Sequence, residues 1–217
     1  MRPASGANDL AVAEYVIAGL FMLLRGAYHA GARVLAGEWP RTDLMGREVA
    51  GRRLGLIGFG AIGRAVASRA RALGMTVAAY DPYVSPDDPA WAGVDARGLD
   101  DIVGESDALS LHVPLTDETR HLIDGKALSR MRPGAVLINA ARGGVVDEDA
   151  LAGALRAGTL GGAMLDVFEN EPLAAGSPLE GVPNLILTPH IAGLSEDSHR
   201  RISAVTAANV RRVLEGS

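Results

Sequence analysis

The segment Gly58-Phe59-Gly60-Ala61-Ile62-Gly63 has the glycine spacing of a dinucleotide-binding loop. An apolar run precedes it and a helical pattern follows it. The first glycine then allows a sharp turn, the second lets the backbone approach a diphosphate, and the third lets helix and strand pack closely. The free N–H groups of Ala61 and Ile62 at the helix start would face the phosphates. In a chain with 27 glycines among 217 residues the pattern arises by chance about 0.4 times, so it needs support from its surroundings.

That support comes from Asp81, which ends the next apolar run 18 residues after Gly63. A carboxylate at this place can accept hydrogen bonds from both hydroxyls of an adenosine ribose, and it would repel the 2′-phosphate of NADP. The motif therefore predicts NAD as the cofactor. Asp-Pro also commonly starts a turn, so Asp81 before Pro82 has a purely structural alternative.

The elements that must position these residues are short apolar runs alternating with helical patterns. The runs lack polar alternation, which is typical of strands in a parallel sheet covered on both faces. We therefore expect an α/β fold with a doubly wound parallel sheet, a Rossmann-type NAD-binding domain. The expected strands are 53–60, running into the glycines, and 75–81, 108–113, 135–139, 162–167 and 185–188. The expected helices are 8–28, 61–73, 99–105, 124–131, 147–157 and 196–214.

The composition excludes several classes of protein. A net charge of -5 argues against a polyanion-binding surface, and 4% aromatic residues argue against stacking on single-stranded nucleic acid. The absence of cysteine excludes disulfides, thiolate zinc sites and cysteine nucleophiles, and no metal site is expected. The longest apolar run, Tyr15 to Leu24, is half the ~20 residues needed to span a bilayer, so we expect no membrane partner. A cytoplasmic location is compatible with these features.

Seven sequence blocks carry a resemblance to a known enzyme family. They are AEYVIAGLFMLLR, LGLIGFGAIGRAVA, YDP, LHVPLTDETRHLI, MRPGAVLINAARGGVVDEDAL, GAMLDVFENEP and LTPHIAG. In these blocks and their order the chain resembles the D-isomer-specific 2-hydroxyacid dehydrogenases over nearly its whole length, and most of all their phosphoglycerate dehydrogenase branch. The resemblance implies an oxidoreductase that transfers hydride between NAD and a small 2-keto or D-2-hydroxy acid.

The resemblance also implies roles for single residues. Arg142 in NAARGG would bind the substrate carboxylate and polarise the ketone, and His190 in LTPHIAG would be the general acid that protonates the carbonyl oxygen. Glu171 in ENEP would hydrogen-bond the His190 ring and keep it protonated. Asp166 would face the nicotinamide carboxamide. Further cofactor-lining positions implied by the family are Val113, Pro114, Ala140, Ala141 and Gly193, and Arg142 and His190 would also border the cofactor. Ala61 replaces an arginine that is frequent in the family, with little loss expected because that contact is mainly made by the backbone.

The chemistry of ketone reduction favours these residue types on its own. A developing alkoxide needs a proton donor that works near neutral pH, and histidine fits. A carboxylate beside it favours the imidazolium, and a guanidinium captures a carboxylate with two hydrogen bonds. Each residue has a plainer alternative: Arg142 could cap helix 147–157 or pair with Asp147, Glu171 could be a solvated loop acid, and His190 could be structural. No comparable setting surrounds the other histidines, which are His29, His112, His121 and His199.

The resemblance also suggests how the chain is divided. Residues 1–28 would be a connecting helix at the boundary of a substrate domain, 29–193 the NAD-binding domain, and 194–217 a helix that packs on the substrate domain. About a hundred preceding residues of the family's usual length would supply most of that domain. A homodimer through the first helix is expected. Two other functions stay open: a non-catalytic NAD-binding dimerisation or regulatory module, and formate oxidation. The second is disfavoured by Glu171, where formate oxidation would need a glutamine.

Overall fold

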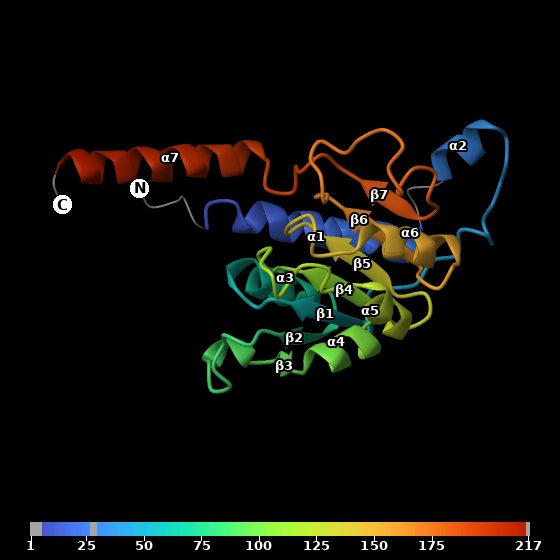
Figure 1. Ribbon diagram of the computed structural model, residues 1–217, viewed down its shortest axis with the longest axis horizontal. Helices are drawn as coiled ribbons and strands as arrows, with labels where there is room; N and C mark the ends of the chain where they lie inside the picture. Colours follow the sequence, from blue (N-terminus) through green and yellow to red (C-terminus); the bar gives the residue numbers. More distant parts are fainter. Residues whose placement is uncertain (1–5, 27–29, 216–217) are drawn as a thin grey trace.

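The apolar runs form one parallel sheet in the computed structural model, which describes residues 6–26 and 30–215 (Figure 1). Its strands lie in the order β3-β2-β1-β4-β5-β6-β7. They are β1 (Arg53–Ile57), β2 (Thr76–Tyr80), β3 (Asp95–Ala96), β4 (Ala108–Leu111), β5 (Val136–Asn139), β6 (Gly162–Leu165) and β7 (Leu185–Leu187). Every residue of β4, β5 and β6 is buried, as strands with helices on both sides require. The expected α/β fold with a doubly wound parallel sheet is confirmed.

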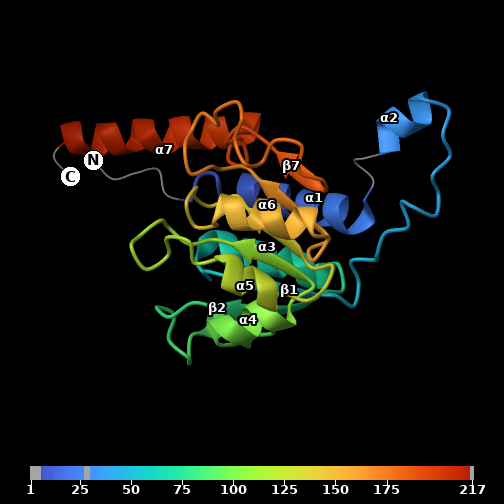
Figure 2. The same ribbon diagram turned by 45° about the vertical axis from the view of Figure 1, so that its right-hand side comes forward.

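Helices cover both faces of this sheet. The α-helices of the described residues are α1 (Asp9–Arg25), α2 (Ala30–Leu35), α3 (Ala61–Ala72), α4 (Leu99–Glu105), α5 (Gly125–Arg130), α6 (Glu148–Arg156) and α7 (Glu196–Leu214). One apolar core joins α1 and α3 to the sheet, and a second core joins α4, α5 and α6 to its other face. Figure 2 shows these last three helices stacked in front of the strands. The cores leave the carboxyl ends of the strands free to carry a site.

The order of the strands reverses between β1 and β4. From β1 the chain continues to β2 on one side, whereas the next half of the sheet begins with β4 on the other side of β1. In such sheets a crevice opens at the carboxyl ends of the two strands, and ligands bind there. The glycine loop follows β1, and His112, Val113 and Pro114 follow β4. The fold therefore directs both segments to the same crevice.

Helix α1 differs from its predicted bounds of 8–28. It ends at Arg25 because Gly26 adopts a left-handed conformation, with φ of 61°, and donates its N–H to Met22 O. Residues 27 and 28, and also His29, lie outside the described residues. One side of α1 packs on α3, β5 and β6, with α3 as its main neighbour. Phe21 and Met22 remain partly exposed on the other side.

Three features at the edges of the fold complete the comparison with the sequence. The sequence did not predict α2 or β3, because six residues without burial and two residues of strand leave no periodicity to detect. Helix α7 keeps its predicted bounds, starts at a Ser195–Ser198 capping box, and runs away from the body (Figure 1). Among the residues described, no helix has the length and apolarity to cross a bilayer.

Candidate active site

The glycine loop between β1 and α3 leaves room for a ligand at its middle position. A Cβ on Gly58, whose φ is 93°, would lie 2.5 Å from His112 O, and one on Gly63 would lie 2.5 Å from Gly58 O. A Cβ on Gly60 would meet nothing within 4 Å. Packing therefore requires Gly58 and Gly63, while the middle glycine, Gly60, faces open space. A cavity of about 430 Å³ lies against Gly60, Ala61, Ile62 and Gly63, and no side chain caps the start of α3. These features fit a diphosphate on the helix N-terminus.

Asp81 lies directly after β2 and holds the glycine loop in place. Its Oδ2 accepts the Phe59 N–H at 2.8 Å, and its Oδ1 accepts the Tyr83 N–H at 2.9 Å. The second bond is the turn expected of Asp before proline, so the structural alternative is present. The first bond places the carboxylate beside the glycine loop. A carboxylate oxygen can accept more than one hydrogen bond, so both contacts are compatible with ribose binding.

A second cavity, of about 390 Å³, continues the first toward His190. The two share Ile62 and His112 in their walls, so together they form one trough along the crevice. The structure brings most of the expected cofactor positions to this second cavity: Val113, Pro114, Ala140, Ala141, Arg142, Asp166, His190 and Gly193. The fit is that of an extended molecule with its diphosphate at one end and its reactive end at His190.

His112 stands where these two cavities meet. Its Nε2 lies 3.0 Å from Ser110 Oγ, and burial lowers the pKa of the ring to about 4. The ring is therefore neutral near pH 7. The ring is hydrogen-bonded, as a structural histidine would be, but it also lines both cavities and therefore borders the cofactor trough.

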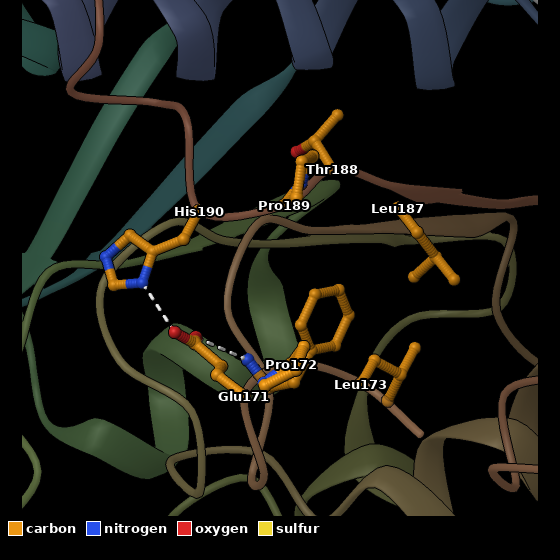
Figure 3. Close-up of a pocket in the computed structure, with 8 residues that line it drawn as sticks. Glu171, Pro172, Leu173, Leu187, Thr188, Pro189 and His190 are labelled. Atoms are coloured by element: carbon orange, nitrogen blue, oxygen red, sulfur yellow. Dashed lines mark hydrogen bonds and ion pairs between the residues drawn. The ribbon is translucent and has the colours of Figure 1, made fainter. Parts of the chain in front are cut away.

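His190 and Glu171 form a pair at the end of the trough (Figure 3). The ring Nδ1 lies 2.8 Å from Glu171 Oε2, and Glu171 Oε1 accepts the Phe168 N–H at 3.1 Å. The hydrogen bond from His190, the largest cause, lowers the pKa of Glu171, and the Phe168 N–H and the charge of Arg142 act in the same direction. Glu171 is thus bonded on both oxygens, which an isolated loop acid would not be. The other ring nitrogen points away from Glu171.

Arg142 lines the same cavity as His190. Its guanidinium is exposed and hydrogen-bonds the neighbouring Ala141 carbonyl. Asp147 accepts the Ala150 N–H at 2.9 Å and so caps α6 without Arg142, and no ion pair joins Arg142 to Asp147 in the described chain. A Cβ on Gly143 would lie 1.6 Å from Phe168 O, so the backbone after Arg142 presses directly on the segment that leads to Glu171.

Asp166 has contacts that the sequence did not reveal. It is 1% exposed and accepts hydrogen bonds from Thr188 Oγ1 at 2.6 Å, the Ile191 N–H at 2.8 Å and the Ala192 N–H at 2.7 Å. The carboxylate thereby fastens the segment around His190, and its role toward a carboxamide stays a prediction. Thr188 was missed at the sequence level, although a hydroxyl two residues before His190 is a usable signal.

A third, mainly apolar cavity borders the His190 and Glu171 pair. It measures about 470 Å³ and is lined by apolar side chains that include Leu173 and Leu187 (Figure 3). Although it is larger than either half of the trough, it lacks Arg142 and the glycine loop. The geometry for hydride chemistry therefore lies in the trough.

Known proteins are similar to this chain in sequence and in fold. The profile of the "D-isomer specific 2-hydroxyacid dehydrogenase, NAD binding domain" matches residues 17–192. An (S)-sulfolactate dehydrogenase of Chromohalobacter salexigens is 60% identical over 98% of this chain and 69% of its own length. A D-3-phosphoglycerate dehydrogenase of Mycobacterium leprae is 40% identical over 98% of this chain, but the chain spans only 40% of that protein.

A solved structure agrees with these sequence relatives. D-lactate dehydrogenase from Aquifex aeolicus, complexed with NAD and lactic acid, superimposes with a TM-score of 0.87 at 35% identity, covering 97% of this chain and 68% of that one. The profile that matches is that of an NAD-binding domain, which agrees with the glycine loop and Asp81. The chain belongs to the D-isomer-specific 2-hydroxyacid dehydrogenase family and carries its NAD-binding domain.

Proposed function

We propose that this chain carries the catalytic half of an enzyme that interconverts a small 2-keto acid and its D-2-hydroxy acid. The observation that carries the proposal is the 2.8 Å contact between His190 Nδ1 and Glu171 Oε2, at the end of a trough that Arg142 also lines. A proton donor and a carboxylate receptor thus face one cavity at the reactive end of an NAD site.

The proposed roles follow from the atoms that each side chain offers. Arg142 binds the substrate carboxylate with two N–H groups, which fixes the neighbouring carbonyl. His190 Nε2 points away from Glu171 and delivers a proton to the carbonyl oxygen, while Nδ1–H stays bonded to the Glu171 carboxylate. When bound, NADH supplies the hydride that reaches the carbonyl carbon. Hydride and proton together convert C=O to CH–OH, and in the reverse direction His190 takes the proton back.

For the substrate we propose a 2-keto acid that bears a second anionic group. The relative at 60% identity acts on (S)-sulfolactate, and the relative at 40% identity is a phosphoglycerate dehydrogenase. The (S) form of sulfolactate has the spatial arrangement of a D-2-hydroxy acid, because the sulfonate-bearing carbon outranks the carboxyl in the naming rules. Sulfopyruvate, the corresponding keto acid, is therefore the first compound to test.

NADH oxidation with sulfopyruvate, phosphohydroxypyruvate, hydroxypyruvate, pyruvate and glyoxylate tests the function. We expect turnover with at least one of the two doubly anionic compounds, and faster turnover than with pyruvate. If NADH binds tightly, none of the five is reduced and NADH changes the oligomeric mass, the chain is a binding module and the proposal is wrong.

Glu171→Gln is expected to lower kcat/KM for the keto acid by about 10- to 100-fold between pH 6 and 8, because the charge-assisted hydrogen bond that orients the His190 ring at 2.8 Å is replaced by a neutral one. Steady-state NADH oxidation measures it. The matched control is Glu169→Gln, because Glu169 makes the same kind of bond, at 3.0 Å, to His121 outside the trough. Equal losses in the two variants would contradict the assigned role.

The pH dependence of the wild type follows from the lowered pKa of Glu171. Its ordinary value is 4.5, so the Glu171 carboxylate is fully charged above that pH, and its charge is lost only as the pH falls through the lower value in the folded protein. A pH–rate profile of the wild type and of Glu171→Gln measures this. If activity falls on acidification already above pH 5 in the wild type but not in Glu171→Gln, the lowered pKa of Glu171 is contradicted.

Asp81→Ser is expected to weaken NADH binding by about tenfold or more, because two ribose hydrogen bonds are lost. The preference for NADH over NADPH, measured as the ratio of the two Kd values, should also decrease, because the repulsion of the 2′-phosphate is lost. Fluorescence titration with both cofactors measures the two Kd values. Asp87→Asn, an exposed acid of the same loop with no hydrogen bond among the described residues, should leave them unchanged. An unaltered NADH to NADPH ratio in Asp81→Ser would remove Asp81 from the ribose site.

We propose that residues 1–28 and 194–217 border a substrate domain and that two copies associate through α1. The partly exposed side chains of Phe21 and Met22 on α1 support the contact between copies. In α7 only Ser198 is buried, which supports packing of this helix on a further domain. Phe21→Asp should shift sedimentation from the mass of two chains to that of one, because a charge would enter an apolar contact. Val213→Asp, on the exposed end of α7, should leave the mass unchanged. A wild type that sediments as a single chain refutes the dimer.

A further inference from the structure

A chain of hydroxyl groups joins α1 to the segment that carries His190. Tyr15 Oη and Thr188 Oγ1 are hydrogen-bonded, and Thr188 Oγ1 lies 2.6 Å from Asp166 Oδ1. The carboxylate of Asp166 only accepts, so the single hydroxyl proton of Thr188 goes to it. Tyr15 must then donate to Thr188. The direction of the chain is fixed from Tyr15 through Thr188 to Asp166.

Asp166 holds the His190 segment at several further points. Its side chain accepts the N–H groups of Ile191 and Ala192, and its backbone carbonyl accepts the His190 N–H at 2.7 Å. His190 itself has a φ of 55°, a left-handed conformation that a residue with a side chain adopts only when its surroundings enforce it. The bonds to Asp166 on both sides of His190 are those surroundings.

The Tyr15 hydroxyl remains a donor over the whole working pH range. Burial, the largest cause, raises its pKa to about 12; the hydrogen bond with Thr188 acts in the opposite direction, and the nearby Asp166 adds to the effect of burial. Its donation therefore does not vary with pH. The group lies on a helix whose buried side is anchored in the apolar core, so the chain begins at a fixed point.

We propose that Tyr15 and Thr188 are positioning residues, which orient Asp166 and through it hold the His190 imidazole where it can protonate a carbonyl oxygen. The inference rests on the proposed function and extends it to two side chains with no role in binding or proton transfer themselves. Thr188 acts directly on Asp166, and Tyr15 acts only through Thr188.

Two substitutions at Thr188 separate the hydroxyl from the packing of the side chain. Thr188→Val keeps the shape and removes the hydroxyl, whereas Thr188→Ser keeps the hydroxyl and removes a methyl group. Tyr15→Phe removes only the first donor, and Tyr80→Phe is its control, because the Tyr80 hydroxyl has no hydrogen bond among the described residues. Thermal melting checks that each variant is folded.

Amide hydrogen exchange at Ile191 and Ala192, measured by NMR without substrate, reads the network directly. We expect exchange about tenfold faster in Thr188→Val and about threefold faster in Tyr15→Phe, the size of a lost hydrogen bond. In turnover, kcat should fall about 10- to 100-fold in Thr188→Val, because a displaced proton donor misses its target. The KM for the keto acid should stay within about twofold. The Tyr15→Phe/Thr188→Val double variant should be no worse than Thr188→Val alone.

The outcomes separate this inference from the proposed function. Normal exchange and normal kcat in folded Thr188→Val overturn the network, as do losses in Thr188→Ser equal to those in Thr188→Val, which would mean a packing role. If Thr188→Val does not fold, faster exchange in Tyr15→Phe but not in Tyr80→Phe supports the network, and no difference overturns it. If the wild type reduces no keto acid, the proposed function fails, but the exchange measurements still decide the network.

Discussion

Replacing His190 with asparagine is expected to lower kcat for keto-acid reduction by about 10²- to 10⁴-fold, the usual contribution of a positioned general acid. Asparagine tolerates the left-handed backbone at this position, where φ is 55°, so the segment should keep its course. It has no ionisable group and cannot deliver the proton. NADH binding should change little, since the diphosphate end of the trough lies at the glycine loop.

The molecule contains its own control for this substitution. His121 is also left-handed, with φ of 49°, and also bonds a glutamate, with its Nε2 3.0 Å from Glu169 Oε1. It does not line either half of the trough. His121→Asn should therefore retain kcat, and stopped-flow traces of NADH oxidation for the two variants should differ by the full predicted factor. Comparable activity in both would show that proton delivery does not depend on His190.

The sheet could be predicted because its information is local. Short apolar runs alternate with helical patterns along the chain, as in run 135–139, which contains β5 (Val136–Asn139). A parallel sheet covered by helices is the arrangement consistent with that alternation. The ends of the strands were harder to predict from the sequence. The run 108–113 was expected to be strand throughout, yet β4 ends at Leu111, because its partner residues Ile57 and Asn139 are the last of β1 and β5. Apolar character does not show where neighbouring strands stop.

The residues of the site also differ in whether local sequence information is enough to predict them. Glu171 and His190 could be assigned to one another because their types are complementary and a family resemblance aligned them. The contacts of Asp166 could not, since they depend on Thr188, 22 residues away, and on backbone N–H groups whose direction only the folded chain sets. Tyr15 lies further still, 173 residues from Thr188, on a helix whose apolar pattern gave no reason to single out one hydroxyl.

Arg142→Met is expected to lower kcat/KM for the keto acid by about 10²- to 10⁴-fold. Two charge-assisted hydrogen bonds contribute about 1.5–3 kcal/mol each, and each 1.4 kcal/mol is a factor of ten. The loss should appear in steady-state kinetics with NADH saturating. The Kd for NADH should stay within about threefold, because Arg142 is only one of many residues that line the cofactor cavity.

Arg142→Lys tests whether charge or geometry dominates. Lysine keeps the positive charge but cannot present two parallel N–H groups to a carboxylate, so it should recover only about tenfold of the loss. Arg130→Lys, at an arginine that pairs with Asp100 at 2.8 Å on the α5 side, should have no effect on turnover. Full activity in Arg142→Lys would mean that Arg142 contributes only its positive charge and not two directed hydrogen bonds to the substrate carboxylate. A loss of NADH binding in Arg142→Met would place its guanidinium on the cofactor, because a residue that binds only the substrate carboxylate leaves the binary complex with NADH intact.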